Sequence, residues 1–298
     1  MKKLFGTILG TLLLTLIWGF GVSAAPAQGT IIALGADLTP EQRTTVLNLM
    51  GVSEEELSAY TVMTITNAEE HQYLDSYVDP SVIGTRALSS VMVTPAESGH
   101  GVMVTTQNIN YCTTGMYRNA LLTAGVEDAD ILVVGPTELS GTAALIGAIK
   151  AYEEMSGKEI ADTTLDTALN ELIATGEIAT KSANSEEVEE LIAYIKAKLA
   201  AGELDTEEDI RKAIAEGEDK FGVSLTEDEI LQIIDFMMKI KKLGLDPNVL
   251  LDQAADLYDQ FGDELLEKAN DEGFLNSLGN FFSSCGNAVV DFFKNLFS

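Results

Sequence analysis

The chain has few of the residues on which most catalytic and metal-binding motifs depend. Its 298 residues include only two cysteines, two histidines and one tryptophan. None of the sequences H-E-x-x-H, C-x-x-C and G-x-S-x-G occurs. These absences argue against a zinc peptidase, a cysteine-bound zinc site and the serine nucleophile of an α/β-hydrolase.

Basic residues are also scarce, with 18 Lys and Arg against 47 Asp and Glu, and the formal net charge is -29. A chain this acidic is repelled by nucleic-acid phosphates and by anionic lipid headgroups, so we expect no nucleic-acid partner. Divalent cations, basic partners and a plain solvated acidic surface are all compatible with it. We expect no cofactor and no defined metal site, and because the EF-hand pattern is missing, we expect calcium binding only as weak, diffuse association.

The few nucleophiles and bases do not form a recognisable catalytic set. A thiol enzyme would need Cys112 and His100 within hydrogen-bond reach, and the simpler interpretation is an exposed turn histidine and a small buried cysteine. Cys112 and Cys285 are far apart in sequence, and we expect both to be unpaired or only incidentally paired. No two carboxylates are singled out for glycoside hydrolysis. The sequence therefore leaves catalytic residues unknown.

The N-terminus has the pattern of a signal peptide over residues 1–25. Lys2 and Lys3 precede an apolar stretch, and Ser23, Ala24 and Ala25 supply the small residues of a cleavage site. We therefore expect a secreted or extracellular protein, with association to the cell envelope as a further option. The apolar stretch approaches the length that spans a bilayer, so an uncleaved anchor stays open as the alternative.

Two regions of different composition follow the leader. Residues 26–157 carry 16 acidic and 4 basic residues and are rich in Val, Ile, Thr and Gly. Residues 158–272 carry 30 acidic and 11 basic residues and show almost no strand pattern. This shift predicts a domain boundary near residue 157.

Hydrophobic periodicity in residues 26–157 predicts elements in the order βαβαββαβα, a mixed β-sheet covered by helices of the α+β or α/β class. Thr39, with Pro40 and Gln42 after it, is expected to cap one helix, and Asn67 the next. The stretch PAESGHG between two strands predicts a β-hairpin. Apolar residues on both faces of 131–134 place that strand near the sheet centre. The predicted strands are 30–34, 60–66, 88–94, 101–106 and 131–134, and the predicted helices begin at residues 39, 67, 113 and 142.

The acidic region is predicted to be entirely helical. Several of its helices open with Ser or Thr followed by acids, as in NSEEVEELI, DTEEDI and LTEDEI. Acids in a first turn are favoured by the helix dipole, so part of the negative charge has a structural explanation. The predicted helices are 162–174, 185–200, 206–221, 226–243 and 247–269.

Residues 273–298 form a separate amphipathic helix by pattern. Their apolar side chains recur at a spacing of three and four, which makes one continuous stripe. A stripe this wide must be covered, either by the protein's own helices or by a membrane surface or partner. Scarce Lys and Arg weaken electrostatic attraction to a membrane. The predicted interaction face consists of Phe274, Leu278, Phe281, Phe282, Val289, Phe292, Phe293 and Leu296.

The stretch ILVVGPTELSGTAALIGAIKAYEEMSG, residues 131–157, is a strand, a Gly-containing turn and a helix by pattern. Such a turn can cradle a phosphate when helix N–H groups and a cation meet there. Here no G-K-[ST] occurs, and Glu138 is expected to repel an anion. Small residues at Gly141, Ala144, Ala148 and Ala151 make a face suited to close packing, so we interpret the stretch as scaffold.

Four strings along the chain carry a resemblance to a known family. They are N-I-x-Y at 108–111, M-Y-x-N-A-L at 116–121, T-A-G-V at 123–126 and S-G-T-A-A-L at 140–145. Together they resemble the YpuA-like family of exported Gram-positive proteins, a domain of unknown function. The resemblance implies export and a shared architecture, and it implies no reaction.

These observations favour a non-enzymatic protein that is extracellular or associated with the cell envelope and acts by interaction. The alternative is an extracellular hydrolase-type enzyme acting on envelope material. The main cleft of the first region distinguishes the two, because convergent polar groups with perturbed titration would favour an enzyme.

Overall fold

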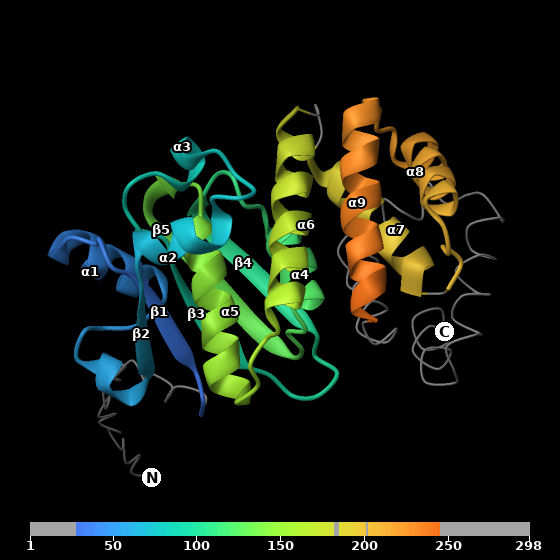
Figure 1. Cartoon of the computed structure of the whole chain (residues 1–298). Helices are drawn as coiled ribbons and strands as arrows, with labels where there is room; N and C mark the ends of the chain where they lie inside the picture. Colours follow the sequence, from blue (N-terminus) through green and yellow to red (C-terminus); the bar gives the residue numbers. More distant parts are fainter. Residues whose placement is uncertain (1–27, 182–184, 201, 245–298) are drawn as a thin grey trace, which may run out of the picture.

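The computed structural model describes residues 28–181, 185–200 and 202–244 (Figure 1). The predicted signal peptide, the helix expected at 247–269, Cys285 and the C-terminal interaction face lie outside the described residues. None of the helices within the described ranges is long and apolar enough to cross a membrane.

The predicted mixed sheet is present. Its strands are β1 (Ile31–Gly35), β2 (Thr61–Ile65), β3 (Ser90–Pro95), β4 (Val102–Ile109) and β5 (Ala129–Leu139), in the spatial order β2-β1-β3-β5-β4. β1 pairs with β2 in parallel, and β4 pairs with β5 in parallel. β3 lies between these two pairs and is antiparallel to both β1 and β5. The interior position predicted for residues 131–134 is confirmed.

The predicted β3–β4 hairpin is wrong, because β5 lies between the two strands. The loop between β3 and β4 instead forms hydrogen bonds with Asp128, the residue before β5. The Asp128 carboxylate accepts hydrogen bonds from the N–H groups of Gly99 and Gly101, each at 2.9 Å. The turn between the strands was predicted correctly. The partner of β3 is β5, a strand further along the chain, and the residues of a turn carry no information about such a distant partner.

Helices cover both faces of the sheet. On one face, α1 (Pro40–Leu49) and the short 3₁₀ helix η1 (Glu56–Ala59) pack over Ile32, Leu34 and Val134. On the other face lie α2 (Asn67–Leu74), α4 (Thr114–Thr123) and α5 (Thr142–Ser156), with the single-turn α3 (Pro80–Ile83) at one end. The larger hydrophobic cluster is on this second face, between the sheet and α4 and α5.

Most helix starts follow the predicted caps. The Thr39 hydroxyl accepts from the N–H of Gln42, and the Gln42 side chain accepts from the N–H of Thr39. The cap of α2 is an exception, because it is Thr66 and not Asn67. Glu69 reaches back to the Thr66 N–H at 2.8 Å, which completes a capping box one residue earlier than expected.

The small-residue face of α5 packs closely on the sheet, as predicted. Ala144, Ala148 and Ala151 are at most 1% exposed, and α5 contacts β1 and β3. Gly147 belongs to the same face, since a Cβ there would lie 3.0 Å from Val91. Any larger side chain would push the helix away from the strands.

The acidic region is helical, as predicted. It consists of α6 (Asp162–Lys181), α7 (Ser185–Ala200), α8 (Glu207–Phe221) and α9 (Glu227–Leu243). Thr206 and Thr226 form the capping boxes that open α8 and α9. Figure 1 shows α4 and α6 between the sheet on one side and α7, α8 and α9 on the other.

Helix α6 is longer than predicted and belongs to both hydrophobic clusters. Leu169 and Leu172 pack with the sheet core, whereas Ile178 packs with α7, α8 and α9. The helix was predicted to end at Ala174, but it continues through Gly176 to Lys181. Gly176 is a close-contact position, where a Cβ would lie 2.4 Å from the methyl group of Met116. The domain boundary near residue 157 stays a prediction.

A buried ion pair joins α4, α6 and α7. The Lys196 ammonium in α7 lies 2.7 Å from Glu171 Oε1 in α6, and both side chains are fully buried. It also donates to the Asn119 carbonyl at 3.0 Å and to Thr123 Oγ1 at 2.8 Å, both in α4. Each ammonium proton therefore has an acceptor, as a buried lysine requires.

Replacing Lys196 with methionine is expected to destabilise the protein by about 3–5 kcal/mol, because Glu171 would be left buried without its counter-charge. Urea denaturation of the full chain measures the change. The double variant Lys196→Met/Glu171→Leu should recover a large part of the loss, since both charges are then removed.

Lys212→Met is the matched control, because the Lys212–Glu208 pair lies on the exposed surface of α8. It should change stability far less than Lys196→Met. Equal effects of the two single variants would contradict a special role for the buried pair.

Candidate functional site

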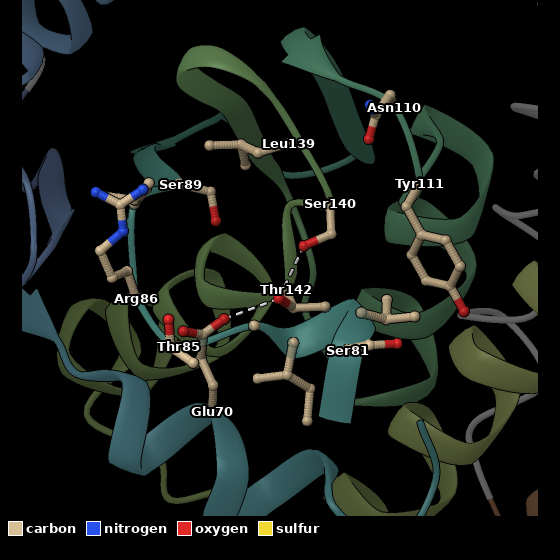
Figure 2. Close-up of a pocket in the computed structure, with 14 residues that line it drawn as sticks. Glu70, Ser81, Thr85, Arg86, Ser89, Asn110, Tyr111, Leu139, Ser140 and Thr142 are labelled. Atoms are coloured by element: carbon tan, nitrogen blue, oxygen red, sulfur yellow. Dashed lines mark hydrogen bonds between the residues drawn. The ribbon is translucent and has the colours of Figure 1, made fainter. Parts of the chain in front are cut away.

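A cavity of about 440 Å³ opens where β4 and β5 end and β3 begins. Figure 2 shows the fourteen residues that line it, and most of the labelled ones are polar. The lining includes the Asn110 side-chain amide, the Arg86 guanidinium, the Glu70 carboxyl and the Tyr111 phenol. Five serine and threonine side chains also belong to it, those of Ser81, Thr85, Ser89, Ser140 and Thr142.

The sheet topology explains why these segments meet. β1, β2, β4 and β5 run in the same direction, so their carboxyl ends share one edge of the sheet. The antiparallel β3 begins at that edge, which brings Ser89 beside Asn110 and Ser140. Ligand sites of α/β sheets commonly lie at this edge. The cavity is therefore at the place where the fold most readily forms a site.

The first turn of α5 is held firmly at the base of the cavity. Gly141 has φ +95°, and a Cβ there would lie 2.8 Å from Ile109 Cγ2. The buried Tyr117 hydroxyl donates to the Gly141 carbonyl at 2.5 Å. Ser89 Oγ accepts from the N–H of Ala144 at 2.9 Å. These contacts fix where the neighbouring residues Ser140 and Thr142 stand.

A chain of hydrogen bonds runs from the cavity into the protein. Ser140 Oγ lies 3.2 Å from Thr142 Oγ1, which donates to Glu70 Oε1 at 2.8 Å (Figure 2). Asn67 Nδ2 donates to the second carboxyl oxygen of Glu70 at 3.2 Å. Glu70 is 1% exposed, and this burial raises its pKa, while the hydrogen bonds from Thr142 and Asn67 act in the opposite direction. The site thus contains an acid that is easier to protonate than an ordinary glutamate.

Arg86 is the cationic residue of the cavity lining and lies on its exposed rim. Two other basic side chains of the sheet region are paired, Arg43 with Glu54 at 3.0 Å and Lys150 with Glu69. Within the part of the chain that the structure describes, Arg86 makes no ion pair. Its guanidinium is therefore available to a ligand.

The structure does not bring the predicted thiol pair together. His100 precedes β4 and lies 3.0 Å from Asp130 Oδ1, whereas Cys112 follows the other end of that strand. Cys112 is free and 1% exposed, and burial raises its pKa to about 12. The expectation of an exposed turn histidine and a small buried cysteine is confirmed. The second histidine, His71, uses its ring nitrogens on Asp75 and on the Gly84 carbonyl.

Glu138 is exposed and does not line the cavity. The β4–β5 register is interrupted between Gln107 and Ile109, and Glu138 lies in the irregular segment of β5 between Val134 and Leu139. Asn108, at φ +59°, supports the bulge by donating to the Gly135 carbonyl at 2.9 Å. Sequence patterns around a strand end cannot show such an irregularity.

The sequence analysis also missed Glu70, Arg86 and Ser89 as site residues. A signal was available, because serines and threonines gather at the strand ends in ALSS and LSGT. The start of β3 and the end of β5 meet because the two strands are antiparallel neighbours, whereas the hairpin prediction paired β3 with β4. The predicted interaction face, from Phe274 to Leu296, lies outside the described residues.

A second hollow, of about 570 Å³, lies between α6 and α9. Glu177, Asp228 and Asp235 give it an acidic rim, and Leu231 contributes an exposed apolar side chain. Across residues 28–181, 185–200 and 202–244, no cluster of three or more His, Cys, Asp or Glu side chains is arranged to hold a metal ion.

Comparison with known proteins identifies the family. The protein-family model described as "Protein of unknown function (DUF1002)" matches residues 34–257, so the chain belongs to this family. The chain is 37% identical over 296 residues to "Uncharacterized protein YpuA" of Bacillus subtilis (strain 168), covering 99% of this chain and all of that relative. The resemblance to the YpuA-like family is thus confirmed. No solved structure gives a significant match.

The variant Glu70→Gln is expected to change how stability depends on pH. The pKa of Glu70 in the folded protein is raised above its ordinary value of 4.5. Its contribution to stability is therefore fully present below that ordinary value and is lost as pH rises through the raised pKa. Glutamine does not titrate, so the wild type should lose stability relative to Glu70→Gln across this window.

Urea denaturation at a series of pH values measures the difference between the two proteins. The exposed carboxyl of Glu138 provides the control variant Glu138→Gln, which should not reproduce the effect. A difference between wild type and Glu70→Gln that grows in favour of wild type with rising pH would show that the pKa of Glu70 is lowered instead.

Proposed function

We propose that this member of the DUF1002 family is an exported, non-enzymatic protein that binds a small polar ligand in the cavity at the carboxyl edge of its sheet. The observation that carries the proposal is a cavity of about 440 Å³ whose lining combines five serine and threonine side chains, a side-chain amide, a guanidinium and a buried carboxyl. That volume suits a small molecule, and a few placed polar groups are what fixes the orientation of such ligands.

The arrangement favours binding over hydrolysis. Glu70 is the single acidic residue in the cavity lining, whereas glycoside hydrolysis uses two carboxylates on either side of the bond. A nucleophile and a base in contact are also needed for covalent catalysis. Both histidines of the chain lie outside the lining, and the pKa of the buried Cys112 is about 12. The polar lining and the raised pKa of Glu70 are the observations in favour of the hydrolase alternative, but the lining lacks the second carboxylate and the nucleophile–histidine pair that such chemistry uses.

Three of the cavity groups are held in place before any ligand arrives. Thr142, Ser89 and Glu70 are each at most 2% exposed and each is hydrogen-bonded to another element of the fold. A preformed site loses little conformational entropy on binding, which favours affinity for a small molecule. This rigidity supports a recognition role.

Export, envelope association and partners are proposed from the sequence. The leader pattern over 1–25 supports secretion, and the apolar stripe from Phe274 to Leu296 supports contact with an envelope or protein partner. We propose no nucleic-acid partner and no cofactor, with calcium bound only weakly and diffusely. A membrane surface has less support than a protein partner, because the stripe has few basic neighbours.

Small polar probes are expected to bind at the cavity. Glycerol, N-acetylglucosamine, phosphate and L-lactate are titrated into the full chain while the backbone amide resonances of Ser140 and Thr142 are followed by NMR. At least one probe should move these resonances in a saturable way.

The variant Ser81→Trp should abolish that shift by filling the cavity from its exposed rim. Thr45→Trp, on the exposed side of α1, is the matched control and should leave it intact. If none of the four probes shifts the resonances, or if Ser81→Trp leaves every shift unchanged, the cavity is not the binding site.

Deleting residues 274–298 should release the protein from the cell envelope and leave its thermal stability nearly unchanged. Cell fractionation and thermal denaturation measure the two properties on the same variant. The substitutions Phe281→Ser and Phe282→Ser provide a control that keeps the length of the chain. A large fall in stability would show that the stripe docks on the protein itself, and unchanged envelope association would remove its interaction role.

A further inference from the structure

The protonation state of Glu70 determines whether Ser140 donates or accepts a hydrogen bond in the cavity. When Glu70 is ionised, Thr142 donates its proton to the carboxylate at 2.8 Å. The oxygen of Thr142 then accepts from Ser140 at 3.2 Å. Each hydroxyl has one proton, so Ser140 has none left and presents only lone pairs to the cavity. In this state the serine accepts hydrogen bonds.

Protonation of Glu70 reverses the chain. The carboxylic acid donates to Thr142, Thr142 donates to Ser140, and Ser140 directs its proton into the cavity. The Asn67 amide continues to donate to the other carboxyl oxygen, at 3.2 Å, in either state. One proton at a buried position thus converts a surface acceptor into a donor. No heavy atom has to move.

The charge of the lining changes with the same proton. Among the residues that line the cavity, Glu70 is the acid and Arg86 is the base. With Glu70 ionised their charges cancel, and with Glu70 protonated the positive charge of Arg86 is left alone. Hydrogen-bond direction and charge therefore change together, and both favour an anion in the protonated state. Arg86 can bind a planar carboxylate with two hydrogen bonds.

We propose that the cavity binds a small carboxylate-bearing ligand, held by Arg86 and Ser140, and that binding is coupled to proton uptake by Glu70. The proposal rests on the proposed function, since it names the ligand class of the same cavity. By linkage, an anion that prefers the protonated site binds more tightly as pH falls, and it also promotes protonation when it binds.

Other charged or titratable groups face Glu70 from the elements around it. Asp37, which follows β1, raises its pKa, and His71 in α2 lowers it. Cys112 and Tyr117 approach from the end of β4 and from α4, and burial raises the pKa of both, so they remain neutral near neutral pH. The pKa of His71 is itself raised by its hydrogen bond to Asp75. His71 therefore needs its own control.

The test compares L-lactate with its neutral amide, L-lactamide, on the full chain by NMR titration. The lactate dissociation constant should be at least about fivefold lower at about pH 5 than at about pH 7.5, because the protonated site favours an anion through both the charge of Arg86 and the donor hydroxyl of Ser140. In Glu70→Gln this pH dependence should disappear. Arg86→Gln should weaken lactate binding about tenfold and leave lactamide unaffected.

Two matched variants show whether these effects belong to Arg86 and Glu70. Arg43→Gln removes a basic side chain that is paired on α1 and should not alter lactate binding. His71→Gln should retain the pH dependence. The proposal is overturned if lactate and lactamide bind alike, if the pH dependence persists in Glu70→Gln, or if it disappears in His71→Gln.

The same titrations separate this proposal from the proposed function. If lactamide or glycerol binds at Ser140 and Thr142 but lactate does not, the carboxylate assignment fails and the binding cavity stands. If no probe moves these resonances, both fail together.

Discussion

The ammonium group of Lys196 is the interaction on which the joining of the helices to the sheet depends. It is fully buried, and its acceptors come from both α4 and α6. Burying a lysine and a glutamate removes both from water, and only a complete set of partners offsets that loss. A shift of α4 or α6 relative to α7 would separate the ammonium from at least one of its acceptors. The pair therefore favours the observed packing of the three helices.

Helix α4 connects the Lys196–Glu171 ion pair to the cavity. α4 carries Thr123 at one end, where the ammonium binds, and Thr113 at the other, where Glu189 of α7 contacts its hydroxyl. Between them, Tyr117 donates to the Gly141 carbonyl and so fixes the first turn of α5. Packing of the acidic helices thus constrains α4, and α4 constrains the base of the cavity. Helix α6 adds a second connection, because its residues belong to the hydrophobic clusters of both regions.

What the sequence predicts well is local, and what it misses is long-range. The Thr39, Thr206 and Thr226 capping boxes depend on residues three positions apart, so they are visible in the sequence. The pairing of β3 with β5 joins segments that lie far apart in the chain, such as Ser90 with Val134, and the turn between β3 and β4 pointed to the wrong partner. The cavity is equally hard to predict from the sequence, because Glu70, Arg86 and Ser140 come from three distant segments. No spacing in the sequence brings them together.

Most acidic side chains that the structure describes differ from Glu70 in how water stabilises their charge. Glu207 and Glu208 at the start of α8 and Glu227 and Asp228 at the start of α9 are exposed, so solvent and the helix dipole stabilise their charges. Glu70 lacks that solvation, because it lies in the fold against Thr142. Distant exposed charges are screened within about 10 Å at 0.1 M salt, so the net charge of -29 sets the long-range field and not the chemistry inside a cavity. What a ligand meets there is decided by one guanidinium, one buried carboxyl and the direction of two hydroxyl protons.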